Sequence, residues 1–149
     1  MRRDNPWKHF VIAFLIAVLV YTVFYIGIER RRVRKGPWLV TFTNSVAGEA
    51  EIVINQPTLA ISNQIIRFPG ESGVSSNAPA TIAFAQPREV PYPVPFGRCV
   101  FMDPTFLPGT LTLQLFGHEI ELLPRVLIID HREQPWRTDP IISLSRTNR

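Results

Sequence analysis

Cysteine is almost absent from this sequence, and histidine is scarce. Cys99 is the one cysteine among 149 residues, so an intramolecular disulfide framework is excluded and the redox compartment is left open. We expect Cys99 to be a small buried hydrophobe. The three histidines are His9, which borders an apolar run, His118 and His131. An enzyme needs a convergent set of reactive groups, and the supply here is thin.

Catalytic and metal-binding motifs are also missing. The chain has no G-x-S-x-G elbow, no glycine-rich phosphate loop and no H-E-x-x-H pattern. We interpret His118 as a turn residue and His131 as part of a polar loop. No recognised spacing joins either histidine to Cys99 or Asp103 as metal ligands. The sequence therefore predicts a non-enzymatic protein without metal or cofactor, and catalysis would require one of these histidines to meet a carboxylate or Cys99 in a cleft.

An excess of positive charge is lacking from most of the chain, although the net charge is +4. The first 35 residues carry eight basic side chains against two carboxylates, giving +6. Residues 36–149 carry eight arginines against ten carboxylates, giving −2. A nucleic-acid groove is not supported, because the excess positive charge lies where lipid head groups would be.

Residues 10–28 form a run of nineteen residues without a charge. As a helix this run would be about 28 Å long, close to the thickness of the bilayer's hydrocarbon core. A cleavable signal peptide has a shorter apolar region and a small-residue cleavage site, whereas Glu29 and Arg30 follow this run directly. The run therefore predicts a single-pass signal anchor that is kept in the mature protein, preceded by a short tail over residues 1–9. Its predicted membrane-spanning side chains include Phe10, Phe14, Val18, Tyr21, Tyr25 and Ile28.

A basic juxtamembrane linker follows over residues 29–36. We expect its side chains to contact lipid head groups. They are Arg30, Arg31, Arg32, Arg34 and Lys35. These outnumber Arg2, Arg3 and Lys8 before the run, so the positive-inside rule favours a cytoplasmic C-terminal domain over an exported one. The counter-argument is that a long domain can be translocated largely regardless of charge.

Two alanines one helical turn apart raise the question of self-association. Ala13 and Ala17 form a small-xxx-small pair, which lets two membrane helices approach closely. A homodimer through this pair is the weaker interpretation, because such pairs are common by chance. Lipid-facing filler is the better one.

Alternating hydrophobicity replaces the helical run after Gly36-Pro37 and predicts strands. Residues 38–43 and 50–55 read as a hairpin across a turn at 44–48. Residues 111–115 and 119–122 read as a second hairpin, with Gly117-His118 as a type II′ turn. Further strands are expected at 61–68, 81–85 and 126–129, the last buried on both faces, with a loop between 68 and 79.

These runs define the predicted fold class. No stretch after residue 36 predicts an amphipathic helix of three turns, and thirteen of the fourteen prolines lie there. We therefore expect an all-β domain over residues 37–149, a small β-sandwich that is Ig-like or a partly open barrel, with seven to nine strands.

Alternating prolines mark residues 91–96, where they fix an extended backbone. Such a segment is a candidate docking strip that presents Tyr92, Val94 and Phe96 to a partner. We favour the alternative, a rigid crossover between two sheets. Trp136, beside Pro135, is either a lid over the core or an interface anchor.

The functional expectation follows from the anchor and from the missing catalytic motifs. A tether confines a small domain near the bilayer and raises its local concentration toward its neighbours. We expect a protein-interaction, accessory or scaffolding subunit whose partners are the lipid bilayer and another membrane protein or complex. The alternative is a membrane-tethered small-ligand or lipid-binding domain, which would need an apolar pocket between the sheets.

Overall fold

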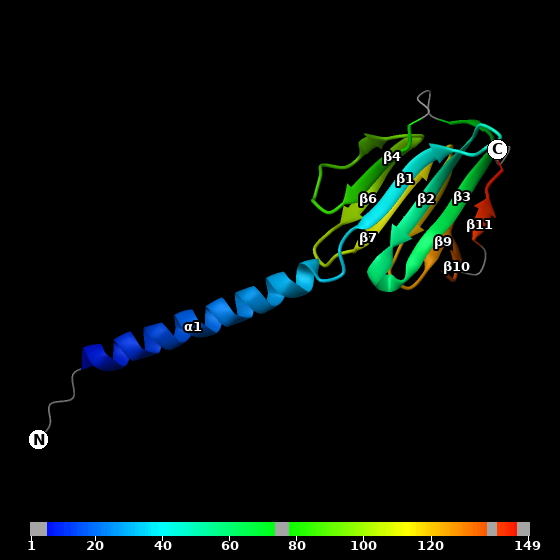
Figure 1. The fold of residues 1–149 in the computed structure, drawn as a ribbon. Coiled ribbons are helices and arrows are strands. Elements are labelled where there is room, and N and C mark those ends of the chain that lie inside the picture. The colour runs from blue at the N-terminus through cyan, green and yellow to red at the C-terminus, as the bar shows by residue number, and fades with distance from the viewer. Residues whose placement is uncertain (1–5, 74–77, 137–139, 146–149) are drawn as a thin grey trace, which may run out of the picture. The chain divides into compact units, whose positions relative to one another are not determined.

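The computed structural model describes residues 6–73, 78–136 and 140–145. It consists of one long apolar N-terminal helix followed by two mostly antiparallel β-sheets (Figure 1). The chain divides into two compact units, residues 1–34 and 35–149.

The helix α1 runs from Pro6 to Val33. Pro6 suits the first helical position, because proline has a preset φ and its missing N–H would be unpaired there in any case. Gly36, with φ +73°, and Pro37 follow closely after the helix ends, as the sequence predicted. The helix is longer than the apolar run at both ends, so residues 29–33 of the predicted linker are helical.

The first sheet has the strand order β11-β3-β2-β1-β4. Its strands are β1 (Trp38–Asn44), β2 (Glu49–Gln56), β3 (Ile61–Ser72), β4 (Ala80–Phe84) and β11 (Ile141–Ser143), with a short 3₁₀ turn at Pro57–Leu59. All pairs are antiparallel except β11 with β3. The arrangement β4-β1-β2-β3 is a Greek key.

The second sheet has the order β10-β9-β8-β7-β6-β5 and is a meander of consecutive strands. Its strands are β5 (Tyr92–Val94), β6 (Gly97–Asp103), β7 (Thr110–Leu115), β8 (His118–Leu122), β9 (Leu127–Ile129) and β10 (Arg132–Gln134). A meander of six strands differs from the immunoglobulin arrangement, in which the chain changes sheets repeatedly.

The core contains buried apolar side chains from both sheets, placed there by strand alternation. Trp38, Phe42 and Ile52 come from the first sheet, and Leu113 and Ile120 come from the second, all with no exposed surface. The indole nitrogen of Trp38 donates to the carbonyl of Gly109, 3.1 Å away, so the largest core side chain is satisfied. Both predicted hairpins are present, and alternate residues of β1, β2 and β8 face inward.

The strand count was predicted wrongly, because the structure has eleven strands in the described residues. Four of them have only three residues, too short to show an alternating pattern. The predicted strand at 126–129 is shorter and is not buried on both faces, since Ile128 is half-buried.

The loop predicted at 68–79 is also partly wrong, because β3 continues to Ser72. The pairing with β2 jumps from Phe68 to Ser72, which leaves Pro69, Gly70 and Glu71 in an irregularity of the ladder. Proline and glycine are tolerated in a strand at such bulges, which is why composition alone indicated a loop.

Candidate functional site

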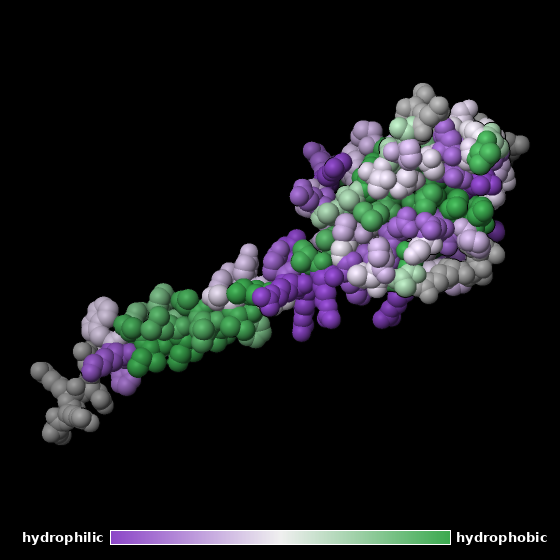
Figure 2. Space-filling view, viewed as in Figure 1, coloured by the Kyte–Doolittle hydropathy of each residue, from purple (hydrophilic) through white to green (hydrophobic). Residues whose placement is uncertain are grey.

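The helix α1 has no buried side chain, although its middle is strongly apolar and carries no charge. It is long and apolar enough to cross a membrane. Figure 2 shows a continuous apolar surface along this stretch, followed by a band of strongly polar side chains. The predicted spanning residues Phe10, Phe14, Val18, Tyr21, Tyr25 and Ile28 all lie on this exposed surface.

Polar groups within the apolar stretch are satisfied locally. Thr22 donates its hydroxyl to the carbonyl of Val18 at 2.8 Å, the pairing by which a hydroxyl is tolerated in a helix without water. Tyr21 and Tyr25 stack with ring centroids 6.2 Å apart. The Thr22 hydroxyl therefore needs no water within the apolar run, and Tyr21 and Tyr25 lie in the half of that run nearer the basic end.

The predicted head-group residues are divided between two settings. Arg30, Arg31 and Arg32 occupy the last turn of α1, where cations are favoured by the helix dipole. Arg32 also pairs with Glu29 at 3.4 Å. Arg34 and Lys35 follow the helix and are exposed. Ala13 and Ala17 lie one turn apart on the exposed helix, and their role in a homodimer stays a prediction.

The entry to the β domain is held by a residue that sequence reasoning missed. Gln56 is fully buried, and its amide nitrogen donates to the carbonyls of Lys35, Gly36 and Pro37 at 2.9, 2.9 and 3.2 Å. Its amide oxygen accepts from the backbone and the hydroxyl of Thr58. A glutamine at the end of an alternating run is the only signal in the sequence, and it does not identify the partners.

The proline-rich segment forms an edge hairpin. Tyr92–Val94 is the edge strand β5, which pairs with β6 across the turn Pro95-Phe96. Val94 belongs to the core, and Tyr92 and Phe96 pack against it. The ring of Phe96 packs edge-on against that of Phe42, with the ring centroids 5.6 Å apart. The crossover between the sheets precedes this hairpin, at residues 85–91, and partner contact by these side chains stays a prediction.

Trp136 covers the core. Its ring stacks on Trp38 with centroids 5.4 Å apart, and its indole nitrogen donates to the carbonyl of Leu123 at 2.8 Å. Both contacts are those of the lid interpretation. A role of the half-buried indole as an interface anchor also stays a prediction.

Cys99 is buried without exposed surface, as the sequence predicted. Burial raises the pKa of its thiol and outweighs the opposing effect of its hydrogen bonds with the Tyr92 side chain and the Phe101 backbone. Burial likewise raises the pKa of the Tyr92 phenol. A thiol in this setting stays protonated and is a poor nucleophile.

The turn assignment of His118 was wrong. The two central residues of the β7–β8 turn are Phe116 and Gly117, both with positive φ, and His118 is the first residue of β8. Positive φ at both central residues is the geometry of a type I′ turn, which usually takes Asn-Gly. Phe116 stands in the asparagine position, so the sequence carries no signal for this turn. His118 is 5% exposed, and its Nδ1 lies 2.7 Å from Asp130 Oδ2.

Asp130 joins this histidine to the turn between β9 and β10. Burial alone would raise the pKa of Asp130, but its hydrogen bonds with His118 and the backbone of Glu119 outweigh that effect and lower it. Asp130 and His131 are the central residues of the turn and both have positive φ, the geometry of another type I′ turn. His131 is exposed, as the sequence predicted.

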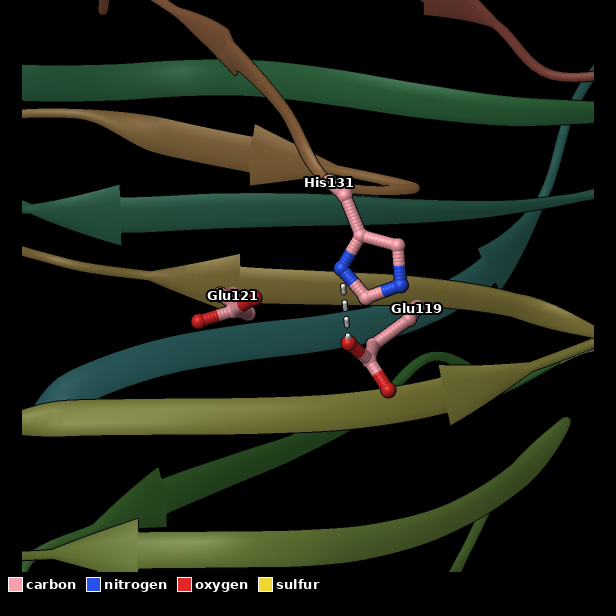
Figure 3. Close-up of side chains that lie close together, drawn as sticks. All are labelled: Glu119, Glu121 and His131. Atoms are coloured by element: carbon pink, nitrogen blue, oxygen red, sulfur yellow. Dashed lines mark ion pairs between the residues drawn. The ribbon is translucent and has the colours of Figure 1, made fainter.

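Three potential metal ligands meet beside that turn. Glu119, Glu121 and His131 each offer one ligand atom, and these atoms lie within 4.8 Å of one another (Figure 3). His131 Nδ1 is 3.7 Å from Glu119 Oε1. Cys99 and Asp103, the partners considered from the sequence, belong to no such group among the described residues. Glu119 and Glu121 form no sequence motif with His131, because the glutamates lie in β8 and the histidine lies in the turn between β9 and β10.

A shallow pocket of about 220 Å³ lies near the end of β4, against β5 and β6. Its lining includes Gln86, Tyr92 and Arg88, whose guanidinium lies 5.4 Å from the centre of the Tyr92 ring. Ligand sites for drug-sized molecules are usually about 300–1,000 Å³, so this pocket is small.

Comparison with known proteins adds no relative. No protein-family model, no curated protein and no solved structure matches this chain.

Proposed function

We propose that this chain is a single-pass membrane protein in which α1 holds a β-sandwich interaction domain beside the bilayer. The exposure of α1 carries the proposal: every described side chain of its apolar run lies outside the core. Each large apolar side chain left in water forgoes about 1.5–3 kcal/mol relative to burial. A bilayer provides the apolar surroundings that the described part of the chain does not.

The β domain acts, in this proposal, by binding another membrane protein as an accessory or scaffolding subunit. Side chains from both sheets fill the core, and the pocket near β4 is smaller than usual ligand sites. That packing favours an interaction surface over a ligand cavity between the sheets. The second candidate, a small-ligand domain, is favoured only by the pocket beside Arg88.

Co-purification from membranes tests the interaction role. A tagged full chain, a chimera with an unrelated membrane helix before residues 35–149, and a tagged helix alone are extracted in mild detergent. We expect the same membrane protein to co-purify with the full chain and with the chimera, but not with the helix alone. Capture of that protein by the helix alone would contradict the proposal, and a small molecule retained in native mass spectrometry would favour the second candidate.

The orientation of the anchor is part of the proposal. The five basic residues after the apolar run favour a cytoplasmic β domain. A reporter active only outside the cytoplasm, fused after Arg149, should therefore be silent. Replacing Arg30, Arg31, Arg32, Arg34 and Lys35 by glutamine should weaken or invert that orientation. An active reporter on the unaltered chain would show that the domain is exported.

A further inference from the structure

We propose that the β domain binds a divalent transition-metal cation, of which Zn²⁺ is the test case, through Glu119, Glu121 and His131. The two carboxylates and the imidazole converge on one outer face of the second sheet (Figure 3). The site lies wholly within the β domain, so it does not depend on the proposed membrane anchorage. It was not expected from the sequence.

Strand geometry places the carboxylates together. Glu119 and Glu121 are two residues apart in β8, so their side chains leave the same face, opposite to that of the buried Ile120. Two carboxylates side by side repel each other, and a cation bound between them would remove that repulsion. Among the described ion pairs, neither has an arginine or lysine partner, and the one pairing found is that of Glu119 with His131.

The turn that carries His131 is tied to the same strand. The backbone N–H of Asp130 donates to the carbonyl of Glu119 at 2.9 Å, and the Glu119 N–H donates to Asp130 Oδ1 at 3.0 Å. Asp130 Oδ2 is held in turn by the buried His118. These bonds fix the start of the β9–β10 turn against β8, so His131 is presented to Glu119 by the fold.

The ligand distances fit a small cation after modest side-chain movement. Zinc holds oxygen and nitrogen ligands at about 2.0–2.2 Å, so neighbouring ligands in a tetrahedral site lie about 3.3 Å apart. His131 Nδ1 and Glu119 Oε1 are already 3.7 Å apart, and all three ligand atoms lie within 4.8 Å. Rotation of the half-buried glutamate side chains and of the exposed His131 ring closes the remaining distance.

The donor set selects the class of cation. An imidazole with two carboxylates suits Zn²⁺, Ni²⁺ or Cu²⁺, whereas Mg²⁺ and Ca²⁺ prefer oxygen ligands alone. Three protein ligands leave the fourth position of zinc open to water or to a donor from another protein. The expected site is therefore three-coordinate from the protein and accessible from solvent.

Calorimetric titration of the full chain in detergent micelles with zinc chloride tests the site, using protein without a histidine tag. We expect saturable binding of one Zn²⁺ per chain and no comparable binding of Mg²⁺. His131→Ala and Glu121→Gln should each weaken binding at least about tenfold, the loss that removal of even an outer-shell partner causes.

Matched controls separate this site from adventitious binding. Glu133→Gln alters an exposed carboxylate of β10 outside the group, and His9→Ala removes a histidine of α1. Both variants should bind Zn²⁺ as the unaltered chain does. Circular dichroism of each variant, with the same spectrum and the same thermal unfolding as the unaltered chain, establishes that the domain is folded. Absence of saturable binding, or equal binding by a folded His131→Ala variant, would overturn the proposal.

Discussion

The helix α1 and the β domain are both rich in large apolar residues, yet they treat them in opposite ways. In α1, Phe10, Leu19 and Phe24 are 65%, 64% and 67% exposed, whereas Trp38 and Phe42 in the β domain are fully buried. The domain buries its apolar side chains between the inner faces of its two sheets. The helix is apolar around its whole circumference, so no single contact face could bury it. The comparison teaches that one region carries its own apolar environment and the other needs one from outside.

The largest expected effect comes from adding charge to the middle of α1. In the double variant Leu19→Asp and Val20→Asp, each aspartate at the helix centre costs about 3 kcal/mol of insertion free energy. We expect the chain to move from the floating membrane fraction to the soluble or sedimenting aggregated fraction in a density gradient. The control exchanges the two residues, Leu19→Val with Val20→Leu, and should leave the distribution unchanged. Retention of the double aspartate variant in the membrane would contradict a spanning role.

Truncation in the core should affect only the β domain. Leu113→Ala removes a side chain without exposed surface, and we expect the domain's free energy of unfolding to fall by about 2–5 kcal/mol. Leu19→Ala, in the exposed helix, should leave that free energy unaltered. Urea denaturation followed by tryptophan fluorescence measures both variants. Equal destabilisation by the two would mean that α1 is part of the core.

The start of the β domain, at residues 35–37, is tested at Gln56. Gln56→Leu keeps most of the side-chain volume but leaves the carbonyls of Gly36 and Pro37 without their amide donor, whereas the Lys35 carbonyl keeps the Thr58 hydroxyl as a donor. Burying polar groups without partners should lower the free energy of unfolding by about 1–3 kcal/mol. Gln86→Leu, at an exposed position, is the control for the same denaturation experiment. If the free energy of unfolding falls no further than in this control, Gln56 does not stabilise residues 35–37.

The smallest effect should distinguish the two kinds of glycine. Gly117 has φ +87° in the β7–β8 turn and open space around its Cα, so Gly117→Ala should cost about 1 kcal/mol through backbone geometry alone. Gly27 also has open space but lies in α1 without positive φ, and Gly27→Ala should not change the domain's stability. Thermal unfolding by circular dichroism compares the two. An unchanged melting temperature for Gly117→Ala would refute the turn assignment.

Sequence reasoning recovered what depends on long periodic runs. The apolar stretch of α1 and the alternation around Trp38, Ile52 and Leu113 each extend over enough residues to fix element type and buried face. It failed where three-residue strands show no period, and where Phe116 occupies a turn position that usually takes asparagine. That error moved His118 from a buried strand to a solvated loop.

The candidate metal cluster could not be predicted for a different reason. Glu119 and Glu121 lie in β8, but His131 comes from the turn after β9, and only the pairing of these strands brings them together. The hydrogen bonds from Gln56 to the carbonyls of Lys35 and Gly36 likewise join residues about twenty positions apart in the chain. Contacts of this kind depend on strand register and turn geometry, which local hydrophobic patterns do not specify.

The central claim, that α1 anchors the β domain in a bilayer, is tested most directly by alkaline carbonate extraction followed by intact-mass measurement. Carbonate releases peripheral proteins but leaves integral ones in the membrane. We expect the full chain to stay in the pellet with a mass that includes α1, and residues 35–149 expressed alone to be soluble. Release of the full chain by carbonate would contradict the account. So would a measured mass that corresponds to a mature chain starting after the apolar run.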